Sequence, residues 1–400
     1  MKKTSFAQIR RIAVERYVNG EDPDDICASV GCSRAWLFKW LRRHNPQDAH
    51  WPEDASRRPE RSPTQLAGHV EEAIVTVRRM LVADRRFSGP QAILWELEDQ
   101  HTEPLPCLST IRRVLQRHSN DPGLARQSRR SQAGSYQSQG IPYPAPASGR
   151  ANLLHQGDFV GPCYLTGGTR FYSLHVVDVA TRRVALEPLE SRHDEVVLAA
   201  IWRIWGRLGL PGRLQLDNEM SFYGSPRHPR STGQLIRLCL HQRVEPLFIP
   251  LGEPWRNAIV EKFNDQFEDK LLDAVTLRNF PHVKEACMAF EHKHNRFFRY
   301  AALDGLTPNA AFALEHGRHA QLRLPETATL PELPLRKPSV GTYRLIRFIR
   351  SDRRLDIFGE KFRVPRDVVY EYVTAIINVK EHVLTVMHQK EVVVVMSYTP

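Results

Sequence analysis

The apolar positions of the N-terminal region follow a helical period. Between Phe6 and Val14 they recur mostly every three or four residues, which predicts an amphipathic helix that ends near residue 20. In the stretch "DPDDICASVGCSRAWLFKWLRRH" that follows, Asp22 and Ser33 can each cap a helix, and Gly31 can form the tight turn between the two helices. We therefore predict a helix-turn-helix domain in residues 1–50.

The second of these helices, residues 33–44, would be the recognition helix that enters a DNA groove. The candidates for its packed side are Ala35, Leu37, Phe38 and Leu41. The candidates for DNA contacts are polar or basic residues: Ser33, Arg34, Lys39, Arg42 and Arg43. The alternative is a small helical bundle whose basic face is only solvated.

A second helical region follows a polar, Pro-containing stretch. Residues 64–120 contain three segments of helical period, the second opened by Ser88 and the third, "LSTIRRVLQRH", by Ser109. The third segment carries Arg112 and Arg113 as candidate DNA contacts, so we expect a second helix-turn-helix or winged-helix-like domain. Residues 121–149 are rich in Gly, Ser, Gln, Pro and Arg and predict a flexible basic linker.

Beyond residue 150 the pattern changes to that of strands. "LLHQGDFVGPCYL", "RFYSLHVVDVAT" and "RRVALEPLE" predict three strands, and helices and strands then alternate to about residue 318. This order is typical of a mixed sheet covered by helices. A Pro-rich linker over 319–340 precedes short strand-like segments in 341–400, which predict a small β-barrel. The fold class is therefore multidomain α+β.

Three acidic residues of the middle region lie where structure alone does not favour them. Asp158 interrupts the first strand, Asp217 ends the fourth strand in "LQLDNEM", and Glu261 lies in the helix after the last strand of this region. Carboxylates gathered in this way can hold two divalent metal ions about 4 Å apart, which is how many enzymes break phosphodiester bonds. Turn-forming or ion-pairing roles are the alternative for each residue taken singly.

Composition narrows the choice of function. The chain has 42% hydrophobic and 25% charged residues, as globular proteins do, and no apolar run long enough to span a membrane. Its six cysteines include no CxxC pair, which argues against structural zinc and for a reducing, cytoplasmic compartment. The net charge of +11 is concentrated in residues 1–130 and 335–400, while the middle is nearly neutral. Basic ends around an acidic site favour a nucleic-acid enzyme.

Four motifs together resemble a known family. "HQGDFVGP", "LQLDNEMSF", "GEPWRNAIVEKFN" and "HNRFFRYAALDGLTP" are similar to motifs of retroviral integrases and of related bacterial insertion-sequence transposases, the Asp-Asp-Glu recombinases. The resemblance covers roughly residues 150–315. It implies a ribonuclease H-like α/β catalytic core over 150–318, with Asp158, Asp217 and Glu261 as the catalytic residues and as ligands of two Mg²⁺ or Mn²⁺ ions.

The resemblance also implies partners and a reaction. The partner would be double-stranded DNA, bound by a homo-oligomer that associates with the nucleoid and not with a membrane. The reaction would be hydrolysis at the 3′ end of a mobile element followed by strand transfer, and Trp255 and Arg256 would contact DNA near the site. Two departures stand out: the spacing from Asp217 to Glu261 is longer than in many relatives, and Glu219 replaces the family's Gly.

Several other polar residues have simpler interpretations. We expect Asp178 to form a turn or ion pair, His155 to pack within its strand, and Asp265 and Glu268 to be solvated or paired with lysines. Two other functions stay open. One is a catalytically silent, domesticated transposase acting as a DNA-binding regulator, and the other is a ribonuclease H-like nuclease that cleaves without joining.

Overall fold

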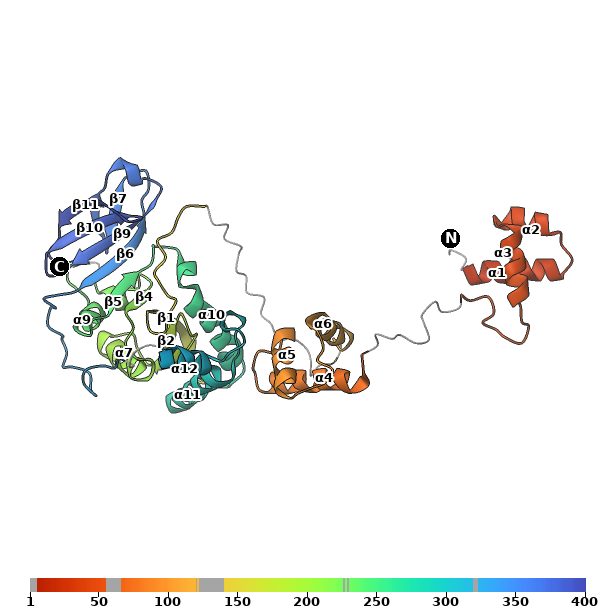
Figure 1. The fold of residues 1–400 in the computed structure, drawn as a ribbon, viewed down its shortest axis with the longest axis horizontal. Helices are drawn as coiled ribbons and strands as arrows, with labels where there is room; N and C mark the ends of the chain where they lie inside the picture. Colours follow the sequence, from red (N-terminus) through yellow and green to blue (C-terminus); the bar gives the residue numbers. More distant parts are fainter. Residues whose placement is uncertain are drawn as a thin grey trace. The chain divides into compact units, whose positions relative to one another are not determined.

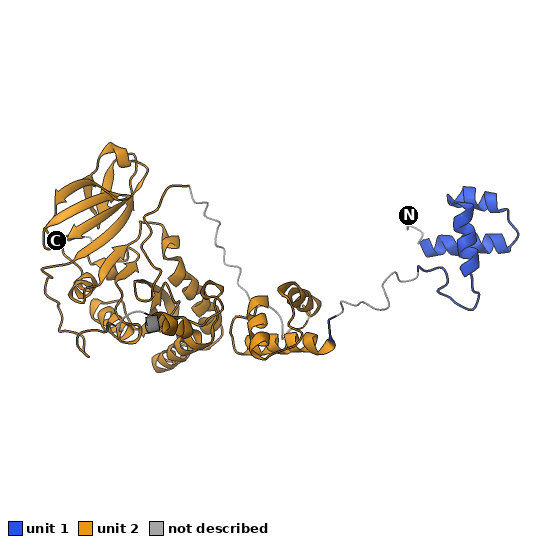
Figure 2. Ribbon diagram, in the orientation of Figure 1, with its two compact units in different colours: residues 1–67 blue, residues 68–400 orange. Residues whose placement is uncertain are grey.

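The computed structural model describes residues 6–54, 66–119, 121, 140–225, 227–228, 230–318 and 323–400. The chain divides into two compact units, residues 1–67 and residues 68–400 (Figure 2). Most of the predicted linker, residues 122–139, lies outside the described residues. In the part of the chain that is described, no helix has the length and apolarity needed to cross a membrane.

The first unit contains three helices, α1 (Phe6–Val18), α2 (Pro23–Val30) and α3 (Arg34–Arg43) (Figure 1). The Asp22 side chain accepts a hydrogen bond from the Asp24 amide at the start of α2, and the Ser33 side chain accepts one from the Trp36 amide at the start of α3. Gly31 ends α2 with φ 73°, a conformation that favours glycine. The predicted helices, caps and turn are therefore all present.

The packed side of α3 differs from the predicted one. Leu37 and Trp40 are buried, whereas Ala35 and Phe38 are exposed. The Trp40 ring packs with Val14 and Trp51 and lies 3.9 Å from the Arg10 guanidinium. The prediction missed Trp40 because basic residues, Lys39, Arg42 and Arg43, lie close to it in the sequence. An aromatic ring covered by arginine side chains still buries its apolar area.

The second unit begins with three more helices, α4 (Gly68–Ala83), α5 (Pro90–Asp99) and α6 (Leu108–Arg117). The predicted segments are present, but their N-caps are Gly89 and Cys107, not Ser88 and Ser109. Arg112 and Arg113 are exposed on α6, and Ile111 and Val114 form its buried side.

A nine-stranded mixed sheet follows, in the order β11-β10-β9-β6-β5-β4-β1-β2-β3. Strands β1 to β3 are antiparallel neighbours, and β4 and β5 run parallel to β1. The strands of its first half are β1 (Leu154–Tyr164), β2 (Arg170–Asp178), β3 (Val184–Leu189), β4 (Arg213–Leu216) and β5 (Glu245–Phe248). The helices are α7 (Asp194–Leu208), α8 (Met220–Tyr223), α9 (Gln234–His241), α10 (Ala258–Phe267), α11 (Phe280–Phe297) and α12 (Pro308–Arg318). Short turns are η2 (Pro254–Asn257), η3 (Glu268–Leu272) and η4 (Ala301–Leu303).

Helices cover both faces of this sheet, which is why β2 is buried almost throughout. Alternate residues of β2 belong to different clusters. Leu174 and Val176 pack with α7 and α9, whereas Phe171 and Val177 pack with α10 and α11. We name these sides the α7 face and the α10 face.

The C-terminal strands extend the same sheet. They are β6 (Thr342–Phe348), β7 (Arg354–Ile357), β8 (Glu360–Arg363), β9 (Tyr372–Asn378), β10 (Val383–His388) and β11 (Glu391–Ser397), with the turn η5 (Arg366–Val368). Strand β6 pairs with β5, and β7 and β8 form a separate hairpin. The predicted strands are present, but their pairing extends the core sheet and does not give the separate small β-barrel that we expected.

The predicted Pro-rich linker is also attached to the core. In its described part, residues 323–340, the Leu335 side chain is buried. The Leu335 amide donates to Gln234 Oε1 at 2.9 Å, and the Leu335 carbonyl accepts from Arg237 Nη1 at 2.7 Å. Both partners lie on α9, so this segment follows the core surface instead of acting as a loose tether.

One edge of the sheet is closed by side chains. The Val184 amide donates to Asn295 Oδ1 at 2.9 Å, and the Val184 carbonyl accepts from Asn295 Nδ2 at 2.8 Å. The Leu186 amide donates to Glu291 Oε2 at 2.9 Å, and its carbonyl accepts from Arg207 Nη2 at 3.0 Å. These outward-facing groups of β3 would otherwise be available to another strand.

Candidate functional site

Asp158 lies on β1 and faces α10. Its cross-strand partner on β2 is His175, and Asn264 of α10 contacts both residues. Asn264 Nδ2 donates to Asp158 Oδ2 at 2.8 Å, and Asn264 Oδ1 lies 2.7 Å from His175 Nδ1. The Phe159 amide donates to Asp158 Oδ1 at 2.8 Å. Hydrogen bonds to both carboxylate oxygens therefore fix the orientation of Asp158.

Asp217 follows β4, the strand parallel to β1. The strand register pairs Gln156 with Gln215, so Asp158 and Asp217 occupy corresponding positions two residues further along each chain. The Phe159 ring stacks on that of Phe222 with centroids 4.7 Å apart, which joins the two segments. Asp217 thus stands clear of the sheet where β4 ends, as the sequence predicts.

Glu261 lies in the first turn of α10, and buried amides attach the start of this helix to the sheet. Gln156 Oε1 accepts hydrogen bonds from the Ile259 and Val260 amides at 3.0 and 3.2 Å. Gln215 Nε2 donates to Asn257 Oδ1 at 2.9 Å. Two of the four amides that a helix leaves unpaired at its N-terminus are satisfied in this way, and the position of Glu261 relative to β1 and β4 is set by them.

The three carboxylates influence one another's protonation. Burial, followed by the charge of Asp217 and then that of Glu261, raises the pKa of Asp158 to about 7. Burial raises the pKa of Asp217 to about 6, and Arg192 opposes the rise. Burial raises the pKa of Glu261, and the charges of Asp265 and Asp217 raise it further. The charge of Asp217 therefore raises the pKa of both of its neighbours, Asp158 and Glu261.

The donor chemistry fits a divalent cation. All three groups are carboxylates, the hard oxygen ligands that suit Mg²⁺ or Mn²⁺. A cation between them would offset the repulsion that, after burial, raises the pKa of Asp158. Within the described ranges, no three His, Cys, Asp or Glu side chains converge closely enough to coordinate one ion.

Two arginines contact the residues that follow Asp217, one through a hydrogen bond and the other through an ion pair. Asn218 Nδ2 donates to the Ile249 carbonyl at 2.7 Å, and Arg347 Nη2 donates to Asn218 Oδ1 at 2.8 Å. Arg347 is buried and comes from β6, so a C-terminal strand supports the loop that carries Asp217. Glu219, which departs from the family motif, forms an ion pair with Arg192.

Other predicted residues have structural contacts. Arg256 pairs with Glu253 at 2.9 Å, donates to the Tyr372 hydroxyl at 3.1 Å and lies 3.7 Å from the Tyr143 ring centroid. Trp255 is partly buried beside it. A DNA contact for either residue stays a prediction, and for Arg256 it would require a change of partners.

The simpler interpretations of Asp178, His155 and Asp265 agree with their contacts. Asp178 is buried and accepts from Thr181 Oγ1 at 2.5 Å and from the Asn152 amide at 3.2 Å, which is a turn-forming role. His155 is buried and lies 2.8 Å from Asn152 Oδ1. Lys262 pairs with Asp265 at 3.3 Å, as expected for a solvated helix surface.

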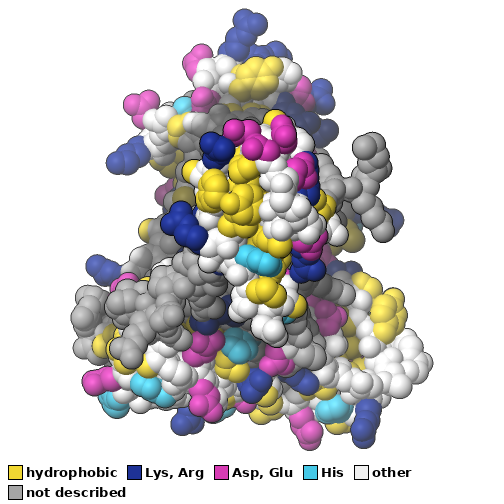
Figure 3. Space-filling view, turned by 90° about the vertical axis from the view of Figure 1, so that its right-hand side faces the viewer, with side chains coloured by type: hydrophobic (Ala, Val, Ile, Leu, Met, Phe, Trp, Pro, Cys, Tyr) yellow, Lys and Arg dark blue, Asp and Glu magenta, His cyan; other side chains and the backbone are white. Residues whose placement is uncertain are grey.

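The candidate DNA contacts of α3 lie in the first unit and are largely exposed. Arg34 pairs with Asp24 at 2.9 Å, while the Arg43 guanidinium lies 4.7 Å from the Trp40 ring. Ser33 is the N-cap of α3, so its hydroxyl already accepts a backbone hydrogen bond. On the side of the molecule seen in Figure 3, Lys and Arg side chains are scattered among acidic and apolar ones. DNA binding by α3 and by α6 therefore stays a prediction.

Sequence reasoning missed the residues that orient the carboxylates. Gln156 and Gln215 each precede an aspartate by two residues, and strand alternation puts such pairs on one face. Asn264 lies one helical turn after Glu261, which places it on the same side of α10. These regularities could have singled out all three residues. No local signal indicates Arg192 or Arg347, because their contacts join distant segments.

Comparison with known families identifies part of this region. Residues 242–308, which include Glu261 and its helix, match the family model of the integrase core domain. This part of the chain is therefore similar to an integrase core domain. The match begins beyond Asp158 and Asp217, so it assigns no role to those two residues.

Some solved integrase structures are also similar to the chain, at low sequence identity. The HTLV-2 integrase catalytic core domain, in complex with magnesium, is 17% identical and covers 41% of this chain and 97% of its own, with a TM-score of 0.32. The BIV integrase core is 16% identical and covers 42% and 97%, with a TM-score of 0.32. An intasome of simian T-cell lymphotropic virus, in complex with PP2A regulatory subunit B56 gamma, is 14% identical and covers 80% and 96%, with a TM-score of 0.37. No curated protein matches the chain. A bacterial insertion-sequence origin stays a prediction.

Proposed function

We propose that the chain is a DNA transposase/integrase of the Asp-Asp-Glu type. The observation that supports this most directly is the grouping of Asp158, Asp217 and Glu261, from two parallel strands and a helix, in an integrase-like core. In the first reaction water breaks a phosphodiester bond at the end of a mobile element and leaves a 3′-hydroxyl. In the second reaction that hydroxyl attacks a phosphodiester of the target DNA.

Asp158, Asp217 and Glu261 would hold two Mg²⁺ or Mn²⁺ ions, which supply Lewis acidity to phosphoryl oxygens and lower the pKa of bound water. The other residues act on these ligands. Asn264 keeps Asp158 turned toward α10, Arg347 holds Asn218 next to Asp217, and Gln156 holds the start of α10. Such partners of metal ligands set the orientation of the donor oxygens.

DNA recognition would be shared between the two helical regions. The exposed basic residues of α3, among them Arg34 and Lys39, would bind the element's ends, as would Arg112 and Arg113 of α6. Charge neutralisation at phosphates makes such binding salt-dependent. A homo-oligomer would bring two element ends together on the target.

The test is a strand-transfer assay with labelled element ends and Mn²⁺. We expect Asp217→Asn to lower joining by at least about a thousandfold, because losing one ligand removes several kcal/mol of transition-state stabilisation. Glu285→Gln is the matched control, since Glu285 is exposed on α11. Joined products that survive Asp217→Asn would refute the assignment.

The same assay separates the alternatives. Cleavage without joined products would indicate a nuclease of the same fold. Specific DNA binding with no cleavage in Mg²⁺ or Mn²⁺ would indicate a silent transposase acting as a regulator.

A further inference from the structure

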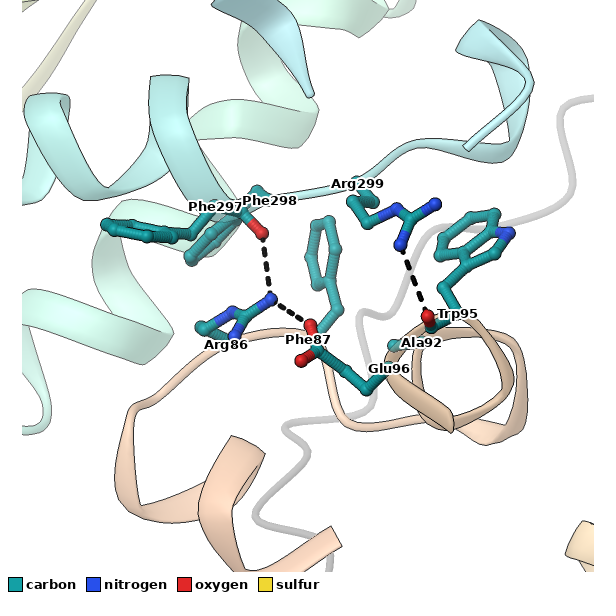
Figure 4. A pocket seen from close by; sticks show the side chains of 8 residues that line it. All are labelled: Arg86, Phe87, Ala92, Trp95, Glu96, Phe297, Phe298 and Arg299. Carbon is teal, nitrogen blue, oxygen red and sulfur yellow. Dashed lines mark hydrogen bonds and ion pairs between the residues drawn. The ribbon is translucent and has the colours of Figure 1, made fainter. Parts of the chain in front are cut away.

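The loop between α4 and α5 is hydrogen-bonded to the core. Arg85 Nη2 donates to the Ala274 carbonyl at 2.9 Å, and Arg86 Nη2 donates to the Phe297 carbonyl at 3.2 Å. In the other direction, Lys270 Nζ donates to the Arg86 carbonyl at 3.4 Å. Figure 4 shows Arg86 between the carbonyl of Phe297 and the carboxylate of Glu96. Donors on both sides thus join this loop to the core.

The same loop contributes an aromatic ring to the hydrophobic cluster of the α10 face. The Phe87 ring lies 4.9 Å from that of Phe298 and 5.4 Å from that of Tyr300, centroid to centroid. It packs against the cluster formed by residues of α10 and α11. The buried side chains of the three helices themselves are others, such as Ile74, Ile93 and Ile111. Phe87 therefore serves the contact with the core.

Helix α5 makes a second contact. The Trp95 indole covers Gly305, where an added Cβ would lie 2.8 Å from Trp95 Nε1 and φ is +81°. Arg299 Nη1 donates to the Trp95 carbonyl at 3.3 Å (Figure 4). The same nitrogen pairs with Asp99 at 2.8 Å. The glycine is needed both for its backbone conformation and for this close approach.

These contacts reach the helix that carries Glu261. Lys270 lies in η3, which continues directly from α10. Helix α6, with the exposed Arg112 and Arg113, packs on α4 and α5. A path of packed elements therefore runs from the basic surface of α6 to the carboxylates, whereas the sequence predicted a separate domain on a flexible linker.

We propose that the α4–α6 unit and the integrase-like core form one rigid body, so that DNA held on α6 lies at one fixed distance from the carboxylates. The inference of a fixed distance rests on the proposed function, whereas the inference of a rigid body does not. Phe87 and Trp95 are the positioning residues. Cleavage would then occur at a constant number of nucleotides from the sequence bound by α6.

The rigid body is tested by hydrogen exchange on the full chain. We expect Phe87→Ala/Trp95→Ala to raise exchange at least about tenfold both in residues 85–89 and in residues 270–275, because each segment protects the other. The amides of α4 should keep their protection, which shows that the three helices stay folded. Met288→Ala, a truncation of an exposed side chain on α11, is the control. Unchanged exchange in residues 85–89 and in residues 270–275 would overturn the rigid body.

The fixed distance is tested by mapping nicks at nucleotide resolution on DNA with a bound element end. We expect one nick position for the wild-type chain and the control, and several positions for Phe87→Ala/Trp95→Ala at unchanged DNA affinity. A single, unchanged position in the double variant would overturn the fixed distance. If the wild-type chain nicks no DNA, the proposed function fails, and the exchange experiment still decides the rigid body.

Discussion

The two faces of the central sheet are built from different side chains. On the α7 face, the buried residues between the sheet and α7 are apolar, with Trp205 and Leu214 fully enclosed. The α10 face also has an apolar cluster, but next to it Gln156, His175 and Asn257 are buried and hydrogen-bonded. Both faces exclude water, and only one of them carries the carboxylates.

This difference separates the side chains that stabilise the fold from those that fix the positions of the carboxylates. Apolar burial stabilises roughly in proportion to area and tolerates small shifts. Buried hydrogen bonds contribute little net stability, but they fix geometry and are costly when one partner is lost. The α7 face can therefore hold the sheet together while the α10 face holds Asp158 and Glu261 in place. Changes on the two faces should have different consequences.

The largest effect is expected on the α7 face. Trp205 is fully buried, and its Nε1 has no hydrogen-bond partner among the described residues. Trp205→Ala should lower the free energy of unfolding by about 3–5 kcal/mol, because the lost ring leaves a cavity. Trp205→Phe should cost less, since it keeps most of the packing and removes an unpaired donor. Urea unfolding measures both, and strand transfer by the folded variants should be unchanged. If a fully folded Trp205 variant lost strand-transfer activity, the separation between stabilising and positioning side chains would be contradicted.

The next effect concerns protonation on the α10 face. His294 is buried with Nε2 2.7 Å from the Tyr300 hydroxyl, and burial lowers its pKa to about 4. Because the unfolded chain binds this proton near pH 6.5, the stability associated with neutral His294 is present above that pH and is lost as pH falls toward 4. The loss should amount to roughly 3 kcal/mol.

His294→Gln removes this titration. The difference in unfolding free energy between the wild type and His294→Gln should therefore shrink or reverse as the pH is lowered from 6.5 to 4. Urea titrations at several pH values measure it. A difference that does not depend on pH would show that His294 is not neutral in the folded protein.

Gln215→Met should have the smallest effect on stability, but it should change the metal dependence of catalysis. Gln215→Met leaves Asn257 Oδ1 without its donor and removes the shorter of two hydrogen bonds to the Arg256 carbonyl, at a cost of about 1–3 kcal/mol. If Gln215 fixes α10, the Mg²⁺ concentration needed for half-maximal activity should rise about 10- to 100-fold. Gln242→Met is the control: Gln242 is also buried, but its partner is the Glu326 amide, outside the site. An equal shift in both variants would contradict a positioning role.

The sequence predicted most of the elements of both faces, because helical and strand periods report burial directly. Strands β1 to β5 and helices α7, α9, α10 and α11 follow that pattern, whereas the short helix α8 was not predicted. Asp158, Asp217 and Glu261 could be selected because acidic residues at strand ends or on a helix face conflict with simple burial.

What the sequence did not reveal depends on contacts between distant segments. The sequences of β5 and β6 do not reveal that these two strands pair. The order of apolar and polar residues in β5 would be the same whether or not another strand paired with its edge. The support of Asn218 by Arg347 follows from that pairing. Likewise, Trp95 and Gly305 look ordinary in the sequence, and their packing becomes visible only when α5 and the core are brought together.

The closed edge at β3 limits how copies of this chain can associate. Growth of a sheet from chain to chain into a fibre needs two free edges on every copy, one to receive a strand and one to offer a strand. Asn295, Glu291 and Arg207 occupy the outward groups of β3. Association through the edges of the nine-stranded sheet is then restricted to the β11 side and can join no more than two copies. Three side chains thus prevent open-ended growth of the sheet in a protein for which we propose a closed homo-oligomer on DNA.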